Sequence, residues 1–124
     1  MRDGKLPAPL DDMRVELLYF DGCPNYRELV PTLRETLARA GISDEIELRQ
    51  VRSIEEAERE RFLGSPTVRV DGRDVDPIAG ERSDYGIKCR LYRVAGASCG
   101  APSEDWIAAA IDDARAREMK SKEW

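Results

Sequence analysis

Apolar and polar positions follow two periods along the first half of the chain, one typical of strands and one typical of helices. VELLYF (15–20) is a nearly continuous apolar run of strand length, as expected of a strand that is buried on both faces. Residues 26–40 place their apolar side chains on one side of a helix, which Gly41 ends. EIELRQV (45–51) alternates and predicts a second strand, with Leu48 on its better-buried face.

The middle of the chain carries a helix-start signal followed by a hairpin signal. The Ser-Ile-Glu-Glu stretch at 53–56 is a capping box, which predicts a short helix over 54–62. TVRV (67–70) is typical of a strand. The Asp-Gly pair at 71–72 then predicts a tight turn into a returning strand over 73–75.

The last third of the chain is irregular until its final helix. Residues 76–102 are rich in Gly, Pro, Ser and Ala, with CRLYRV (89–94) indicating a short strand. Ser103 caps a helix with one apolar face. That face, predicted to lie in the core, carries Trp106, Ile107, Ala110, Ile111 and Ala114.

The elements follow in the order β-α-β-α-β-β-α, which predicts an α/β fold with a mixed central sheet flanked by helices. The first connection requires a right-handed parallel crossover, and the hairpin adds antiparallel strands. We expect one domain over residues 14–119, a flexible N-terminal tail over 1–13 and a C-terminal tail over 120–124. Cys23 then lies where the first strand passes into the first helix.

Charge and hydropathy limit the partners and the compartment. The chain of 124 residues has 20 basic and 25 acidic side chains, and no block of Lys and Arg stands out. Nucleic acid and anionic membranes are therefore not expected as partners. No apolar run reaches the roughly 18 residues of a membrane span, and residues 1–12 lack the apolar core of a signal peptide. We expect a cytoplasmic protein.

The chain contains no histidine, which restricts its chemistry. Cys-His and Ser-His nucleophile pairs are excluded, as is every zinc motif that needs imidazole. Cys23, Cys89 and Cys99 cannot all pair with one another and lack the close spacing of a structural zinc site. We therefore expect free thiols in a reducing cytosol, no metal and no cofactor.

Three features in register resemble the thioredoxin-like superfamily. CPNY (23–26) stands where that family has its C-x-x-C motif, after the first strand and at the start of the first helix. Pro31 lies inside a helical run at the offset from Cys23 at which the family has a kinking proline. SPT (65–67) precedes the hairpin strand, as the family's cis-proline does. The resemblance covers roughly residues 14–117 and implies the thioredoxin-like fold.

A narrower resemblance and one departure refine this interpretation. YFDGCPN (19–25), GSPTV-x-VDGRD (64–74) and CRLYR (89–93) are similar to a group of short bacterial thioredoxin-like proteins, some of which are named alkylmercury lyase. Tyr26 stands where the resolving cysteine of C-x-x-C would be. Cys23 therefore cannot close the usual local disulfide, and an ordinary dithiol reductase is excluded unless another thiol substitutes.

Cys23 is the predicted nucleophile. The positive end of the following helix favours a thiolate there, and Pro24 suits the first helical position, where no N–H is missed. The alternative is an inert, half-buried cysteine. Tyr26 either covers the apolar side of its helix or hydrogen-bonds a thiolate or a leaving group. Asp21 is either a turn residue or a proton donor.

The segment Ser65, Pro66 and Thr67, together with Pro24 beside the cysteine, is predicted to bind substrate. The resemblance implies a cis peptide bond after Ser65, which would present this backbone to an incoming chain or ligand beside Cys23. Without the resemblance, Pro66 would only end the preceding helix, because cis bonds are about 5–6% of X–Pro bonds.

Cys89 and Cys99 compete as the thiol that resolves Cys23. The hairpin returns the chain towards the edge that carries Cys23, so either thiol could approach it. Cys89 is favoured because CRLYR belongs to the resembled group, although Cys89 could equally be a strand cysteine that only packs.

The leading functional expectation is thiol redox chemistry on a protein or small-molecule disulfide. Cys23 would form a mixed intermediate that Cys89 or an external thiol resolves. The narrower resemblance implies a second function, in which two thiolates hold mercury or another soft metal and Asp21 protonates the carbon of an organomercurial. A third interpretation is a binding module that kept the fold and lost the dithiol chemistry. The sequence leaves the oligomeric state open.

Overall fold

In the computed structural model, strand β1 (Val15–Tyr19) is an inner strand of the sheet. Four strands pair in the order β2-β1-β3-β4. β2 (Glu47–Gln50) runs parallel to β1, as a right-handed crossover requires. β3 (Thr67–Val70) is antiparallel to β1, and β4 (Arg73–Asp74) is antiparallel to β3. The predicted mixed sheet is therefore confirmed.

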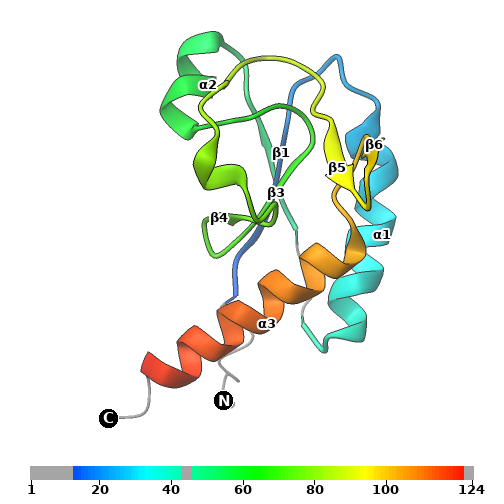
Figure 1. Cartoon of the computed structure of the whole chain (residues 1–124), viewed down its shortest axis with the longest axis vertical. Coiled ribbons are helices and arrows are strands. Elements are labelled where there is room, and N and C mark those ends of the chain that lie inside the picture. Colours follow the sequence, from blue (N-terminus) through cyan, green and yellow to red (C-terminus); the bar gives the residue numbers. More distant parts are fainter. Residues whose placement is uncertain (1–12, 43–45, 122–124) are drawn as a thin grey trace.

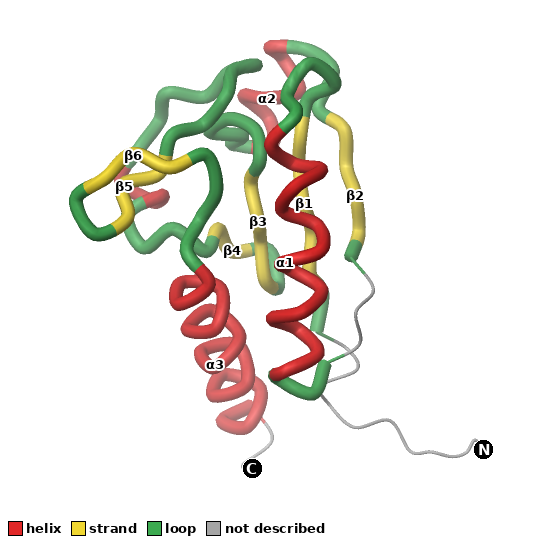
Figure 2. Tube along the Cα trace, turned by 90° about the vertical axis from the view of Figure 1, so that its right-hand side faces the viewer, coloured by secondary structure: helices red, strands yellow, loops and turns green. Residues whose placement is uncertain are grey.

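The structure describes residues 13–42 and 46–121, and within them three α-helices cover the sheet (Figures 1 and 2). α1 (Asn25–Arg39) and α3 (Glu104–Ser121) pack on one face, and α2 (Ile54–Glu60) packs on the other. In this part of the chain, no helix has the length and apolar character needed to cross a membrane. The α/β class predicted from the sequence is confirmed.

Alternation along β1 builds a core on each face of the sheet. Leu17 is fully buried on the side of α1 and α3, whereas Leu18 is fully buried on the side of α2. The larger core joins the stripe of α1 to β3 and α3 through Leu29, Leu33, Leu37, Val68, Ile107 and Ile111. The smaller core joins Leu18 to Val51, Ala57 and Phe62.

Local sequence signals set the ends of the helices. The Ser53 hydroxyl accepts a hydrogen bond from the Glu56 amide over 3.0 Å, and the Ser103 hydroxyl accepts one from the Trp106 amide over 3.1 Å. Each bond satisfies an amide that the first turn leaves unpaired. Gly41 follows α1 with a φ of +75°, which glycine adopts without strain. Both predicted N-caps are confirmed.

Two tight hairpins follow the same turn chemistry. The Asp-Gly pair at 71–72 has φ values of +52° and +83° and joins β3 to β4, as predicted. Ala-Gly at 95–96 has φ values of +54° and +84° and joins β5 (Tyr92–Val94) to β6 (Ala97–Cys99) in a separate two-stranded sheet. The sequence indicated a strand within 89–94 but missed its partner, because β6 is only three residues long and lies in a stretch rich in Gly, Ser and Ala.

Two predicted core positions are wrong. Leu48 is 51% exposed, because β2 is an edge strand and the pattern alone does not give the order of strands. Trp106 is only partly buried: its ring stands edge-on to Tyr92, with 6.1 Å between ring centroids. The apolar stripe of α3 instead buries Ile107 and Ile111.

The predicted tails extend too far into the chain. Met13, assigned to the N-terminal tail, is 9% exposed and belongs to the larger core. α3 continues to Ser121, past the predicted domain end at residue 119. The rest of the two tails, residues 1–12 and 122–124, lies outside the described residues.

The face under α2 also buries charge. Glu16 of β1 is 2% exposed and accepts a hydrogen bond from Arg49 over 2.8 Å, with Arg14 at 3.1 Å. Arg49 also pairs with Glu60 of α2 at 3.1 Å, and Arg69 of β3 lies 3.7 Å from the same carboxylate. Because a buried carboxylate requires partners, this network fixes how α2 sits on the sheet.

The contrast between Leu33 and Leu48 gives a test of the packing. Leu33→Ala should lower the free energy of unfolding by about 2–5 kcal/mol, because Leu33 is fully buried and the substitution leaves a cavity. Leu48→Ala should change it by no more than about 0.5 kcal/mol, because half of that side chain is already in water. Urea unfolding followed by circular dichroism measures both, and equal losses would contradict the strand order.

Candidate functional site

Cys23 lies in the short link between β1 and α1. The chain turns at residues 21–22, and the Cys23 amide donates a hydrogen bond to the Phe20 carbonyl over 3.2 Å. Pro24 follows at the N-cap of α1, with a φ of −77° and an exposed ring. The predicted strand-to-helix junction is confirmed.

The Cys23 thiol is covered. The residue is 1% exposed, and its Sγ donates a hydrogen bond to the Ser65 carbonyl oxygen over 3.5 Å. The sequence predicted a nucleophile whose thiolate the positive end of α1 favours. Burial of the sulfur does not fit a freely accessible nucleophile, and among the described residues no backbone amide donates to Sγ. A reagent reaches Cys23 only when its cover moves.

The cover includes the segment that carries Cys89, and Ser65 holds it in place. The Ser65 amide donates to the Lys88 carbonyl over 2.8 Å, and the Ser65 carbonyl accepts from the Arg90 amide over 2.9 Å. These two bonds form an isolated parallel bridge between Ser65 and Cys89. The peptide bond between Ser65 and Pro66 is cis, as expected from the sequence.

The two thiols are neighbours across this bridge. Cys89 is exposed, whereas Cys23 is buried. Partial loss of solvent, followed by the interaction with the neighbouring Cys23 thiol, raises the pKa of Cys89 above its ordinary value. The fold therefore brings together two cysteines that are distant in the chain. The Ser65 hydroxyl beside them is fully buried and has no hydrogen-bond partner among the described residues.

Arg90 fixes the position of the segment that carries Cys89. Its side chain is 0% exposed and pairs with Asp74 through two hydrogen bonds, of 2.7 and 3.2 Å. It also donates to Asp76 over 3.2 Å and to the Thr67 hydroxyl over 3.0 Å. A buried guanidinium is stable only when such partners replace water. The backbone at residues 89–90 is therefore held against the sheet.

Tyr92 and Gly64 also pack against Arg90. The Tyr92 ring lies under the Arg90 guanidinium, 4.4 Å from ring centroid to Cζ, and its hydroxyl donates to the Pro66 carbonyl. Burial raises the pKa of Tyr92, so this hydroxyl remains a donor. Gly64 has a φ of +129°, and a Cβ there would meet the Arg90 Cβ at 2.9 Å and the Lys88 carbonyl oxygen at 3.0 Å. Only glycine allows this close approach.

Pro66 and Thr67, two of the predicted substrate-binding residues, are therefore occupied within the fold. Both are buried, and the Thr67 hydroxyl donates to the Gly64 carbonyl over 2.6 Å while it accepts from Arg90. Their observed contacts hold Arg90 and Tyr92. Of the predicted segment, Ser65 is the residue that contacts the Cys23 thiol.

Tyr26 packs against β1, and Asp21 is exposed to solvent. The Tyr26 ring stacks on Tyr19, with 4.1 Å between centroids, and its hydroxyl accepts a hydrogen bond from Arg27 over 3.2 Å. Asp21 is exposed in the turn after β1. Among the residues that the structure describes, neither side chain is hydrogen-bonded to Cys23.

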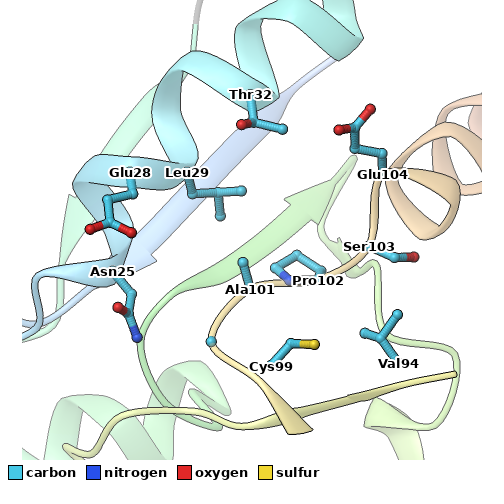
Figure 3. Close-up of a pocket in the computed structure, with 11 residues that line it drawn as sticks. Asn25, Glu28, Leu29, Thr32, Val94, Cys99, Ala101, Pro102, Ser103 and Glu104 are labelled. Atoms are coloured by element: carbon cyan, nitrogen blue, oxygen red, sulfur yellow. The ribbon is translucent and has the colours of Figure 1, made fainter. Parts of the chain in front are cut away.

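Cys99 lies in a separate surface pocket of about 500 Å³ (Figure 3). The pocket separates the first turns of α1 from the chain that leads into α3, and neither of the other cysteines lines it. Figure 3 shows the sulfur of Cys99 directed towards Val94. Gly100 fits closely here, because a Cβ would stand 2.7 Å from the Asn25 side chain. The structure thus brings Cys89, not Cys99, to Cys23.

Sequence reasoning missed the cluster around Arg90. Two signals were available: the spacing of Asp74 and Asp76, and the two-residue spacing of Arg90 and Tyr92, which puts both on one side of a strand. An arginine at a buried position of such a pattern requires acidic partners. Nothing in the local sequence says that the partners lie on β4 and just after it.

The described residues hold no group of three or more His, Cys, Asp or Glu side chains placed to bind a metal ion. Comparison with known proteins finds no matching family model, no matching curated protein and no matching solved structure.

Removal of the Arg90 charge tests the cluster. Arg90→Met should lower the free energy of unfolding by about 3–5 kcal/mol, because it leaves Asp74 and Asp76 without their buried counter-ion. Arg93→Met is the matched control, since Arg93 is exposed and should change stability by about 0.5 kcal/mol or less. Urea unfolding compares the two variants, and similar losses would contradict the role of Arg90.

The difference in burial predicts the order of alkylation. In the folded protein at neutral pH, iodoacetamide should modify Cys89 before Cys23, because Cys89 is exposed and Cys23 is 1% exposed. The modification rate of Cys89 should rise with pH with a midpoint above that of an ordinary cysteine, and Cys23→Ala should lower this midpoint by removing the neighbouring thiol. Peptide mass spectrometry measures the rates, with urea-unfolded protein as the control. Faster labelling of Cys23 in the folded protein would contradict the assignment.

Proposed function

We propose that the chain is a thioredoxin-like thiol redox protein whose reactive unit is the pair Cys23 and Cys89. The observation that carries the proposal is the contact of these two thiols across Ser65. The strand order β2-β1-β3-β4, with α1 and α3 on one face and α2 on the other, supports the thioredoxin-like fold that the sequence resembles. Cys89 takes the role of the missing second cysteine of the C-x-x-C motif.

The order of attack follows from exposure. The sequence predicted Cys23 as the attacking thiol, but the exposed Cys89 is the thiol that an incoming disulfide meets. The Cys89 thiolate attacks one sulfur of the substrate disulfide, the substrate S–S bond breaks, and one half leaves as a thiol. This step forms a mixed disulfide at Cys89.

Cys23 completes the reaction. It gives up its proton and attacks the Cys89 sulfur, which releases the second half of the substrate as a thiol. The substrate gains two electrons and two protons, and the protein is left with a Cys23–Cys89 disulfide. Ser65 guides this step, because its carbonyl holds the Cys23 sulfur and its backbone bridges to Cys89. Two external thiols, or one external dithiol, return the pair to the reduced state and leave as a disulfide.

The raised pKa of Cys89 limits the rate at which Cys89 attacks the substrate disulfide. At neutral pH most Cys89 is protonated, and only the thiolate attacks a disulfide. The exchange therefore accelerates as the pH rises towards the pKa of Cys89. We propose a cytoplasmic protein that uses no cofactor and acts on a protein or small-molecule disulfide.

Soft-metal binding is a second candidate, and the same contact favours it. Two neighbouring thiols suit a two-coordinate soft cation. Cleavage of an organomercurial also requires an acid, and Asp21, which the sequence offered for that role, is exposed in a turn. A binding module without chemistry is the third candidate, and it differs from the other two in needing neither thiol.

Mild oxidation tests the proposal. Glutathione disulfide should convert the protein to a Cys23–Cys89 bridge, because each thiol is in reach of the other. Cys23→Ser should instead accumulate a glutathione adduct at Cys89, since the resolving thiol is gone. Non-reducing peptide mapping measures both products.

Two further variants serve as controls for this oxidation. Cys99→Ser should form the same bridge as the unmodified chain, because Cys99 lies in a different pocket. Cys89→Ser should leave Cys23 largely unmodified, because Cys23 is buried. If no bridge forms, or if Cys23 pairs with Cys99 instead, the proposed redox pair is wrong.

A further inference from the structure

A pocket lined by arginines lies on the α2 side of the sheet. Its volume is about 590 Å³, and its walls come from the end of α2, the β3–β4 hairpin and the short 3₁₀ helix η2 (Ala79–Glu81). Figure 1 shows α2 and β4 on the same side of the molecule, with β5 and β6 on the other. The pocket contains neither of the reactive thiols. Its basic side chains are Arg59, Arg61, Arg69 and Arg73.

The acidic residues of this pocket do not neutralise these arginines. Glu60 and Asp74 line the pocket. Glu60 is shared between Arg49 at 3.1 Å and Arg69 at 3.7 Å. Both carboxylate oxygens of Asp74 accept hydrogen bonds from Arg90. One of them also accepts a hydrogen bond from the Asp76 amide over 2.9 Å.

Three of the arginines are therefore uncompensated. Arg59, Arg61 and Arg73 are exposed, and none of them forms an ion pair with another described residue. The whole chain has a net charge of −5, so this gathering of positive charge opposes the overall balance. A local excess of cations in a concave site concentrates anions.

Arg69 forms the floor of this pocket. Its side chain is only 12% exposed, and its guanidinium donates to the carbonyls of Glu60 and Arg61 at the end of α2. Burial lowers the pKa of Arg69 despite the attraction of Asp74, Glu16 and Glu60. The protein's own carboxylates thus leave this buried cation incompletely stabilised, and a bound anion would supply the missing charge.

We propose that this pocket binds a small molecule with a multiply charged oxyanion, such as a phosphate ester or a polycarboxylate. The guanidinium groups of Arg61, Arg69 and Arg73 hold the oxyanion, because the planar fork of arginine matches phosphate and carboxylate oxygens. The volume leaves room for an organic part beside the half-buried ring of Tyr85. The site is independent of the thiol pair and does not rest on the proposed redox function.

Calorimetry at fixed ionic strength tests the site with three probes: pyrophosphate, adenosine monophosphate and citrate. Saturable binding of at least one probe is expected, and it should weaken as sodium chloride is added. Arg73→Gln and Arg61→Asn should each weaken that binding by about tenfold, the value of one charge-assisted hydrogen bond. Asparagine is chosen at 61 because Arg61 has a φ of +56°, which asparagine tolerates.

Arg34→Gln is the matched control. Arg34 is an exposed arginine of α1 without an ion pair among the described residues, so the substitution removes the same charge at a distance from the pocket. It should leave binding unchanged. The phosphate probes and citrate distinguish the two ligand classes. If no probe binds saturably, or if Arg34→Gln weakens binding as much as Arg73→Gln does, the proposal is overturned.

Discussion

A single buried cation holds the irregular chain around Cys89 against strands β3 and β4. Arg90 is enclosed by two carboxylates, a hydroxyl and an aromatic ring, and none of its charge reaches water. Because an isolated ion of this kind is strongly destabilising in a protein interior, its partners must be in place at the same time. The chain at 64–67, 74–76 and 89–92 therefore adopts its structure as one unit. The contact between the two thiols is a by-product of that requirement.

Asp74 connects the two proposed sites. One side of β4 presents this carboxylate to Arg90 and hence to the segment of Cys89, while the same residue lines the arginine pocket. The thiols stand at the end of β1, whereas the pocket lies beyond β3 and under the end of α2. The two sites thus share a wall without sharing a reactive group. The Asp74 carboxylate pairs with Arg90, which holds the Cys89 segment, and so it does not neutralise the arginines of the pocket.

The sequence predicted those parts of the fold that depend on neighbouring residues. Ser103 caps α3 by a bond to an amide three residues on, and the Asp-Gly turn at 71–72 depends on its own backbone angles. The exposure of Leu48 could not be predicted, because it depends on which strand lies at the edge. The burial of Cys23 was missed for the same reason, since Ser65 and the segment of Cys89 come from far along the chain. The cysteine itself was found because its place at a strand-to-helix junction is a local feature.

The distance along the chain between the two neighbouring thiols has a thermodynamic consequence. A covalent link between residues 23 and 89 would close a loop of more than half of the chain. In the chain-entropy description, a loop of that size makes the unfolded ensemble less favourable by about 4 kcal/mol. The oxidised and reduced forms would then differ in melting temperature and in resistance to proteolysis, although their folded shapes were the same. The rate at which proteases degrade the protein would then depend on the redox state of its surroundings.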